Sequence, residues 1–206
     1  NVTCSRCDAA VALPKGSGRA FEAFIRELEG VLKNEYAVTD PDVTLTCAAA
    51  ETAKAVSAER TVTLVQALTA MPHGVEAMDT DFPGLVQTSL NMGVVKLDGD
   101  GLHIAFSIRS SIASRKLMLA QRVRAVAALA GGTVVERGVY PGWQYKRESQ
   151  FRDTLLAAYK DLTGKDGVVE ATHGGLECGL LMEKIPGLDA VSMGPELHDV
   201  HSVRER

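Results

Sequence analysis

Apolar residues recur at helical spacing in three stretches of this sequence. In residues 19–33, 55–71 and 149–162 they return every three or four positions, so that they share one face of a helix. A fourth helix is predicted over residues 115–130, where we expect Ser114 to be the cap because a serine side chain accepts hydrogen bonds from the free N–H groups of a helix start.

Alternating apolar and polar positions predict strands, and the clearest pair forms a hairpin. Residues 85–97 and 102–110 flank Asp98-Gly99-Asp100-Gly101, a sequence typical of a tight hairpin turn. The preceding helix is expected to end at Pro72-His73-Gly74. Shorter apolar segments predict further strands at residues 4–12, 42–48, 133–139, 168–169 and 190–192.

The order of these elements predicts an α/β (α+β) fold. Through residues 1–144 the order is β-α-β-α-β-β-α-β, which is that of a two-layer sandwich related to the ferredoxin-like arrangement. Residues 145–206 contain a helix and short, continuously apolar strands, as in a sheet covered on both faces. We therefore expect two domains, with Tyr140-Pro141-Gly142-Trp143 at their junction.

Composition narrows the class of protein. The 206 residues are 46% hydrophobic and 23% charged, as is usual for a globular domain. A net charge of -4 without a basic stripe argues against nucleic-acid binding. No apolar run approaches the roughly 20 residues of a membrane span. Four scattered cysteines and a polar N-terminus without a signal sequence predict a cytoplasmic location.

Several polar and glycine positions at expected strand ends are candidates for chemistry. Arg109 is either a carboxylate-binding guanidinium or an ordinary arginine at a strand end. Gly174-Gly175 either present backbone N–H groups to a ligand or let a strand turn into a helix. Glu177 has three possible roles, as an acid, a metal ligand or a partner of a helix start. His201 is either a zinc ligand or a solvated histidine.

A series of short motifs occurs in one order and is more informative than any single motif. They are Pro72-His73-Gly74-Val75, residues 88–95, Ile108-Arg109-Ser110, residues 140–144, residues 173–179, Ser192-Met193-Gly194-Pro195 and His201-Ser202. This series closely resembles the C-terminal half of the bacterial aminoacyl-histidine dipeptidases (Xaa-His dipeptidases, carnosinase-like). They belong to a larger family of two-zinc exopeptidases that also contains peptidase T and the aminoacylases.

The resemblance implies a fold and a set of roles. Members have a two-zinc α/β catalytic domain with an inserted lid domain, and they usually form homodimers. Residues 1–144 then correspond to most of the lid, and residues 145–206 to the returning catalytic segment. The resemblance implies that Asn1 and Gly175 contact substrate, that Arg109 holds the substrate's C-terminal carboxylate and that His201 is the last zinc ligand. It also marks Glu177 as a motif acid without an assigned role.

The same resemblance implies that the other zinc ligands and the general-base glutamate lie before Asn1. No catalytic residue is therefore expected in this chain, and we expect it to be inactive by itself. The implied function of the whole protein is zinc-dependent hydrolysis of Xaa-His dipeptides by a metal-activated water. Two alternatives are a lid and dimerisation module without chemistry of its own, and another two-zinc exopeptidase such as a tripeptidase or deacylase.

Overall fold

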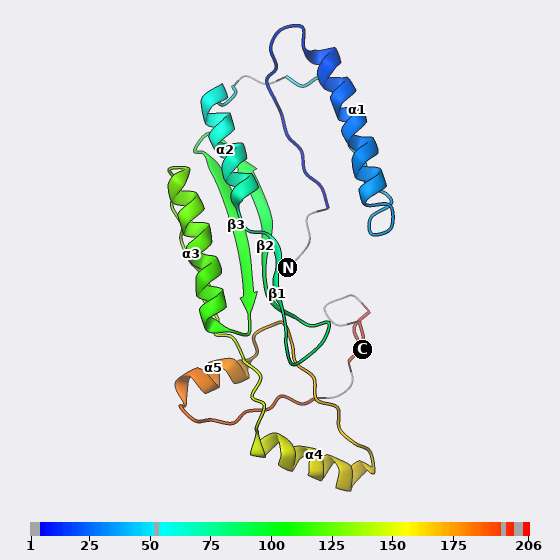
Figure 1. The fold of residues 1–206 in the computed structure, drawn as a ribbon, viewed down its shortest axis with the longest axis vertical. Coiled ribbons are helices and arrows are strands. Elements are labelled where there is room, and N and C mark those ends of the chain that lie inside the picture. Colours follow the sequence, from blue (N-terminus) through cyan, green and yellow to red (C-terminus); the bar gives the residue numbers. More distant parts are fainter. Residues whose placement is uncertain (1–4, 52–53, 195–196, 200–203) are drawn as a thin grey trace. The chain divides into compact units, whose positions relative to one another are not determined.

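The computed structural model describes residues 5–51, 54–194, 197–199 and 204–206 of the chain (Figure 1). These residues divide between two compact units, Ser5–Val62 and Thr63–Arg206, which are described separately. Two of the candidate site residues, Asn1 and His201, lie outside the described residues.

The first unit contains helix α1 (Gly18–Glu35), which confirms the helix predicted over residues 19–33. Its apolar side is only partly covered within this unit, since Phe24 and Val31 each remain 54% exposed. The strands expected at residues 4–12 and 42–48 are wrong for their described positions, which have no strand structure. Neither segment has a neighbouring strand to exchange backbone hydrogen bonds with, and alternation alone does not provide one.

Helix α2 (Ala58–Ala70) begins three residues later than the predicted 55–71. Ser57 explains the later start because its hydroxyl oxygen accepts a hydrogen bond from the Arg60 N–H at 3.2 Å. This is the contact by which serine stabilises a helix N-terminus.

The second unit is built on a sheet of three antiparallel strands in the order β1-β2-β3, counted over the described residues. Strands β2 (Val86–Leu97) and β3 (Leu102–Ser110) confirm the predicted hairpin. Strand β1 (Gly74–Met78) was not predicted, because Pro72-His73-Gly74 indicated only the end of a helix. It pairs with the first half of β2, so the chain turns directly from helix to strand at Gly74.

A β-bulge interrupts β2 at Gly93. Met92 lies opposite Phe106 and Val94 lies opposite Ala105, which leaves Gly93 as the extra residue. The neighbouring Met92 N–H donates to Nδ1 of His73 at 3.0 Å. His73, which lies between α2 and β1, therefore satisfies a backbone donor beside the irregularity.

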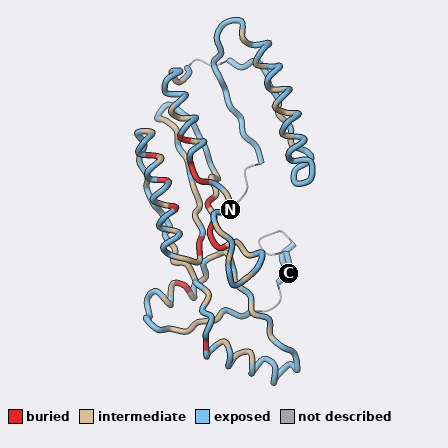
Figure 2. Tube along the Cα trace, viewed as in Figure 1, coloured by how far each residue is buried: buried red, intermediate tan, exposed pale blue. Residues whose placement is uncertain are grey.

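Helix α3 (Ala113–Leu129) packs against β2 and β3 and forms the core of the second unit with them (Figures 1 and 2). Leu119 and Leu90 are almost fully buried, with 0% and 2% of their surface exposed. The expected cap at Ser114 is wrong: Ile112 occupies the N-cap position and Ser114 lies inside the helix. The helix begins at Ala113, two residues earlier than predicted.

Two further helices follow, α4 (Gln150–Thr163) and α5 (Glu177–Lys184). The strands expected around them, at residues 133–139, 168–169 and 190–192, are wrong, since all three segments are irregular. Val135 and Val168 show why, because they remain 75% and 83% exposed and are not part of a covered sheet. The mixed α/β class itself is confirmed.

Helix α4 confirms the prediction over residues 149–162 and has a buried cap. The Ser149 hydroxyl accepts from the Arg152 N–H at 3.1 Å and donates to the Asp189 carboxylate at 2.8 Å. Asp189 also accepts from the Phe151 N–H at 3.2 Å. The Ser149 hydrogen bond lowers the pKa of Asp189, with a smaller contribution from Phe151. One serine thus links the start of α4 to the segment before the C-terminus.

Replacing Ser149 by alanine is expected to lower the free energy of unfolding by about 1–2 kcal/mol, because the helix loses its cap. The pKa of Asp189 should rise as its main hydrogen-bond donor is removed. Urea unfolding followed by fluorescence of Trp143, the single tryptophan, measures the change. Ser114→Ala is the matched control, expected within about 0.5 kcal/mol of the parent. Equal losses in both variants would contradict the role of the cap.

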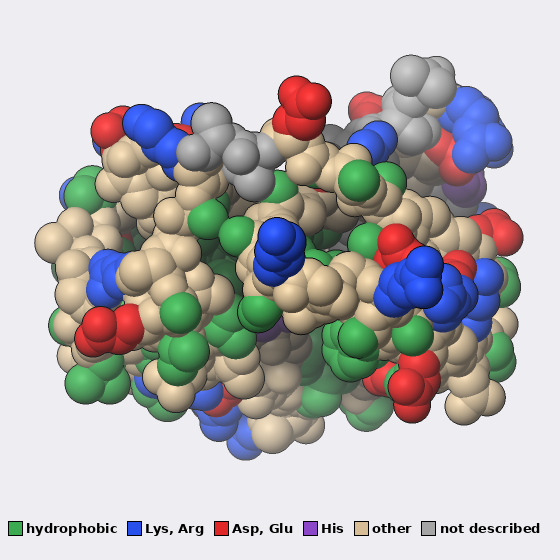
Figure 3. Space-filling view, turned by 90° about the horizontal axis from the view of Figure 1, so that it is seen from above, with side chains coloured by type: hydrophobic (Ala, Val, Ile, Leu, Met, Phe, Trp, Pro, Cys, Tyr) green, Lys and Arg blue, Asp and Glu red, His purple; other side chains and the backbone are tan. Residues whose placement is uncertain are grey.

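In the part of the chain that the structure describes, no helix combines the length and apolar character needed to cross a bilayer. On the face shown in Figure 3, basic side chains lie next to acidic ones and form no continuous basic stripe among the residues drawn in colour.

Candidate functional site

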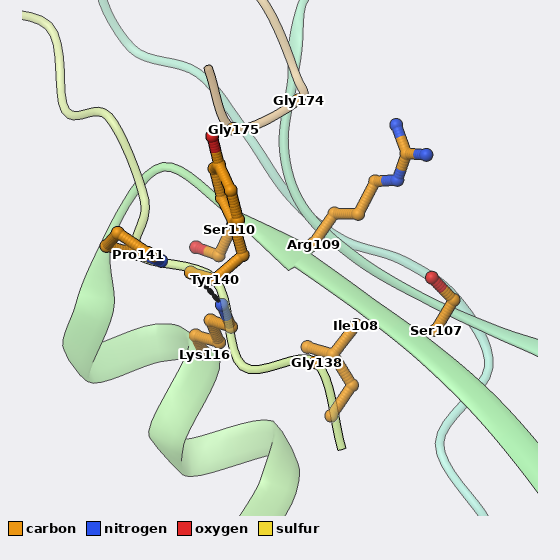
Figure 4. Close-up of a pocket in the computed structure, with 10 residues that line it drawn as sticks. All are labelled: Ser107, Ile108, Arg109, Ser110, Lys116, Gly138, Tyr140, Pro141, Gly174 and Gly175. Atoms are coloured by element: carbon orange, nitrogen blue, oxygen red, sulfur yellow. Dashed lines mark hydrogen bonds between the residues drawn. The ribbon is translucent and has the colours of Figure 1, made fainter. Parts of the chain in front are cut away.

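A pocket of about 290 Å³ lies where β3 ends (Figure 4). It is bounded by the last residues of β3, one lysine of α3, the segment 138–141 and the loop that precedes α5. The lining residues are Ser107, Ile108, Arg109, Ser110, Lys116, Gly138, Tyr140, Pro141, Gly174 and Gly175. Two of the predicted site residues, Arg109 and Gly175, therefore lie at the same pocket.

Arg109 reaches this pocket because of its register in the sheet. It lies directly opposite Ser89 of β2, whereas the neighbouring Ser110 lies opposite Thr88 and both are buried. Since side chains alternate along a strand, Arg109 occupies the face opposite to Ser110. Figure 4 shows its guanidinium extending away from Tyr140. Among the described residues nothing accepts a hydrogen bond from this group, which leaves its parallel N–H donors available for a carboxylate.

The loop at Gly174 and Gly175 closes the pocket on the other side. A Cβ atom on Gly175 would lie 2.5 Å from Cδ1 of Tyr140, so the aromatic ring can contact this backbone only because residue 175 is glycine. A Cβ on Gly174 would be 3.8 Å from Nη1 of Arg109. The Gly174 N–H donates to the Thr172 hydroxyl at 3.2 Å, which tightens the loop.

Glu177 is an exposed residue in the first turn of α5, directly after this loop. A carboxylate there interacts favourably with the positive end of the helix dipole. This position fits one of the three roles considered for Glu177, that of a partner of a helix start. Burial raises the pKa of the Tyr140 phenol, and the negative charge of Glu177 raises it further.

His173 is a site residue to which the sequence analysis assigned no role. Its Nε2 lies 2.8 Å from Oγ of Ser89, a hydrogen bond between residues 84 positions apart. Its Nδ1 is buried and has no hydrogen-bond partner among the described residues. Burial is the main cause that lowers the pKa of this imidazole; the backbone of Val86 opposes the shift and the positive charge of Arg109 adds to it. The net effect favours the neutral form of the imidazole.

Lys116 is a second lining residue that the sequence did not indicate. Its ammonium group donates to the backbone carbonyl of Tyr140, and burial lowers its pKa despite the nearby Glu136 and Glu183. The contact ties the start of α3 to the segment that carries the aromatic ring. Lys116 thus fixes Tyr140 in the pocket wall.

A zinc centre needs three or more protein ligands. Within residues 5–51, 54–194, 197–199 and 204–206, no group of three His, Cys, Asp or Glu side chains is arranged to hold a metal ion. The described residues do not fit a zinc site by themselves, and His201 lies outside them.

Two known proteins that are similar to this chain are named as dipeptidases. No family model matches the sequence. The cytosol non-specific dipeptidase of Escherichia coli K12 is 31% identical over 199 residues, which are 96% of this chain and 41% of that protein. The chain is homologous to part of a dipeptidase. The crystal structure of aminoacylhistidine dipeptidase from Vibrio alginolyticus is similar with a TM-score of 0.83 at 30% identity, over 94% of this chain and 40% of that one.

These dipeptidases confirm the resemblance found in the sequence and the α/β fold class. The chain spans about two fifths of the length of both proteins. Its division at residue 144 and the substrate contacts of Asn1, Arg109 and Gly175 stay predictions.

Proposed function

We propose that this chain is part of a zinc-dependent dipeptidase that hydrolyses Xaa-His dipeptides. Its similarity to two proteins named as dipeptidases, over nearly all of its own length, supports the reaction class. The observation in the chain itself that carries the proposal is the guanidinium of Arg109, which is free of partners among the described residues and lies beside Gly174 and Gly175. This arrangement suits a terminal carboxylate.

The part of the chain in this reaction is to orient the substrate. Arg109 binds the terminal carboxylate through two parallel hydrogen bonds, and the backbone at Gly175 lines the same site. Asn1 is proposed as a further substrate contact and His201 as one zinc ligand. Zinc, when bound, supplies an activated water for hydrolysis of the peptide bond. The remaining zinc ligands and the general base are proposed to lie outside residues 1–206.

The proposed location is the cytoplasm, in keeping with the name of the Escherichia coli relative. The proposed assembly is a homodimer. Strand β3 supports it because, among the described residues, one of its edges has no paired strand. An unpaired edge can extend the sheet across a two-fold axis.

A direct test compares residues 1–206 with the natural gene product that contains them. Residues 1–206 are expected to release no histidine from an Xaa-His dipeptide, with or without added zinc. The gene product is expected to hydrolyse it, to lose activity to a chelator and to recover it with zinc. Hydrolysis by residues 1–206 alone would contradict the proposed division of the site. A chelator without effect would contradict the metal requirement.

Two alternative functions predict different results. Another two-zinc exopeptidase would prefer tripeptides or N-acyl amino acids, which are compared in the same assay. A lid and dimerisation module without chemistry is favoured only by the open edge of β3. It predicts a dimer of residues 1–206 in sedimentation together with an inactive gene product.

A further inference from the structure

The pocket at the end of β3 is also supported by a residue outside its lining, Ser89 of β2. Ser89 and Arg109 are opposite each other in the β2–β3 ladder, so their side chains lie on the same face of the sheet. The other face, with Leu90 and Thr88, is buried in the core. Ser89 and Arg109 therefore form a rigid base, because the strand that carries each of them is held by the core behind it.

His173 connects the 172–175 loop to this base. Its Nε2 is 2.8 Å from the Ser89 hydroxyl, and the next residue, Gly174, has its backbone close to Nη1 of Arg109. The loop is also held by the Thr172 hydroxyl within itself and by the Tyr140 ring against Gly175. Of these contacts, the Ser89–His173 hydrogen bond links the loop to the strand that lies beside Arg109.

Both ring nitrogens of His173 face the protein. One ring nitrogen bonds to Ser89, and the other is buried without a partner among the described residues. The backbone of Val86 also interacts with this ring. Because Nδ1 is buried, the ring is suited to position the loop and not to contact a substrate.

We infer that His173 is a positioning residue: bonded to Ser89, it holds the 172–175 loop so that the Gly174–Gly175 backbone and the Arg109 guanidinium face one carboxylate together. The inference rests on the proposed function for the identity of that carboxylate. It goes beyond it by assigning roles to Ser89 and His173.

The kinetic test uses the natural gene product and an Xaa-His dipeptide. Ser89→Ala is expected to raise KM about tenfold and to leave kcat within about threefold, because one neutral hydrogen bond that orients the binding loop is lost. Ser89→Thr, which keeps the hydroxyl, should restore most of the loss. His173→Phe should raise KM, whereas the same exchange at the exposed His103 should not. A general loss of folding would lower kcat as well and would not be rescued selectively by threonine.

A second measurement does not depend on peptidase activity. In ¹⁵N-labelled residues 1–206, acetate is expected to shift the Arg109 Nε–H signal and the Gly174 and Gly175 amide signals together. In Ser89→Ala the Arg109 signal should still respond while the glycine amides respond less. Coupled responses that persist in Ser89→Ala would overturn the inference.

The two measurements distinguish the positioning role of His173 from the proposed function. A wild-type gene product that cleaves dipeptides while Ser89→Ala keeps its KM overturns the positioning role and leaves the proposed function intact. A wild-type gene product without dipeptidase activity overturns the proposed function, and the acetate titration then decides the role of His173.

Discussion

Replacing Arg109 by alanine is expected to raise KM for dipeptides roughly 100-fold in the natural gene product. The guanidinium has no partner among the described residues, so its parallel N–H donors are free for the substrate carboxylate. Loss of two charge-assisted hydrogen bonds corresponds to about 3 kcal/mol, which is roughly two orders of magnitude in affinity. Steady-state kinetics measure the effect, and the change in kcat is expected to be smaller.

Two further variants test whether the effect depends on the paired donors of Arg109. Arg109→Lys keeps the charge but not the paired donors, so it should recover only part of the affinity. Arg124→Ala removes an exposed arginine whose partner is Glu136 at 2.9 Å, and such surface pairs contribute little. KM should therefore stay near the wild-type value. An unchanged KM in Arg109→Ala would remove the basis for placing the carboxylate at this pocket.

Gly142→Ala is expected to lower the free energy of unfolding by about 2–4 kcal/mol. Its Cβ would lie 2.6 Å from the Ser111 carbonyl oxygen and 2.7 Å from that of Ser110. These backbone atoms cannot move easily, because the Ser110 hydroxyl is itself bonded to the buried Thr88 at 2.9 Å. The segment that carries Tyr140 would have to separate from the end of β3.

Urea unfolding followed by Trp143 fluorescence measures this loss in residues 1–206. Gly99→Ala is the matched control, because a Cβ there meets open space and the residue has no positive φ. Its stability should stay within about 0.5 kcal/mol of the parent. If both variants unfold at the same urea concentration as the parent, the close contact between Gly142 and the end of β3 does not exist in solution.

The elements that could be predicted depend on residues close together in the chain. The apolar spacing of α1 and α4 and the turn at Asp98–Gly101 act over a few residues, and the structure contains both helices and the hairpin. The apolar segments at residues 42–48 and 133–139 also looked like strands. They form none, because a strand needs a partner and a pattern within one segment cannot show whether one is present.

Some residues of the candidate site could likewise be predicted from the sequence, and others could not. Arg109 and Gly175 were found through motifs whose spacing is visible in the sequence, and the fold brings both to one pocket. Lys116 and His173 were not found. Nothing in the sequence distinguishes Lys116 from the other lysines until its contact with the Tyr140 carbonyl is known. His173 lies within a recognised motif, but its partner Ser89 is 84 residues away.

The sequence by itself determined helices α1 to α4, the β2–β3 hairpin and the resemblance to dipeptidases, since these depend on local periodicity, turn chemistry and motif order. Only the tertiary structure decided that β1 joins the sheet and that Ser89 supports His173 beside Arg109. It also showed why residues 142 and 175 are glycines. The physical reason is that these features are contacts between segments distant in the chain, and such contacts form only when the whole unit packs.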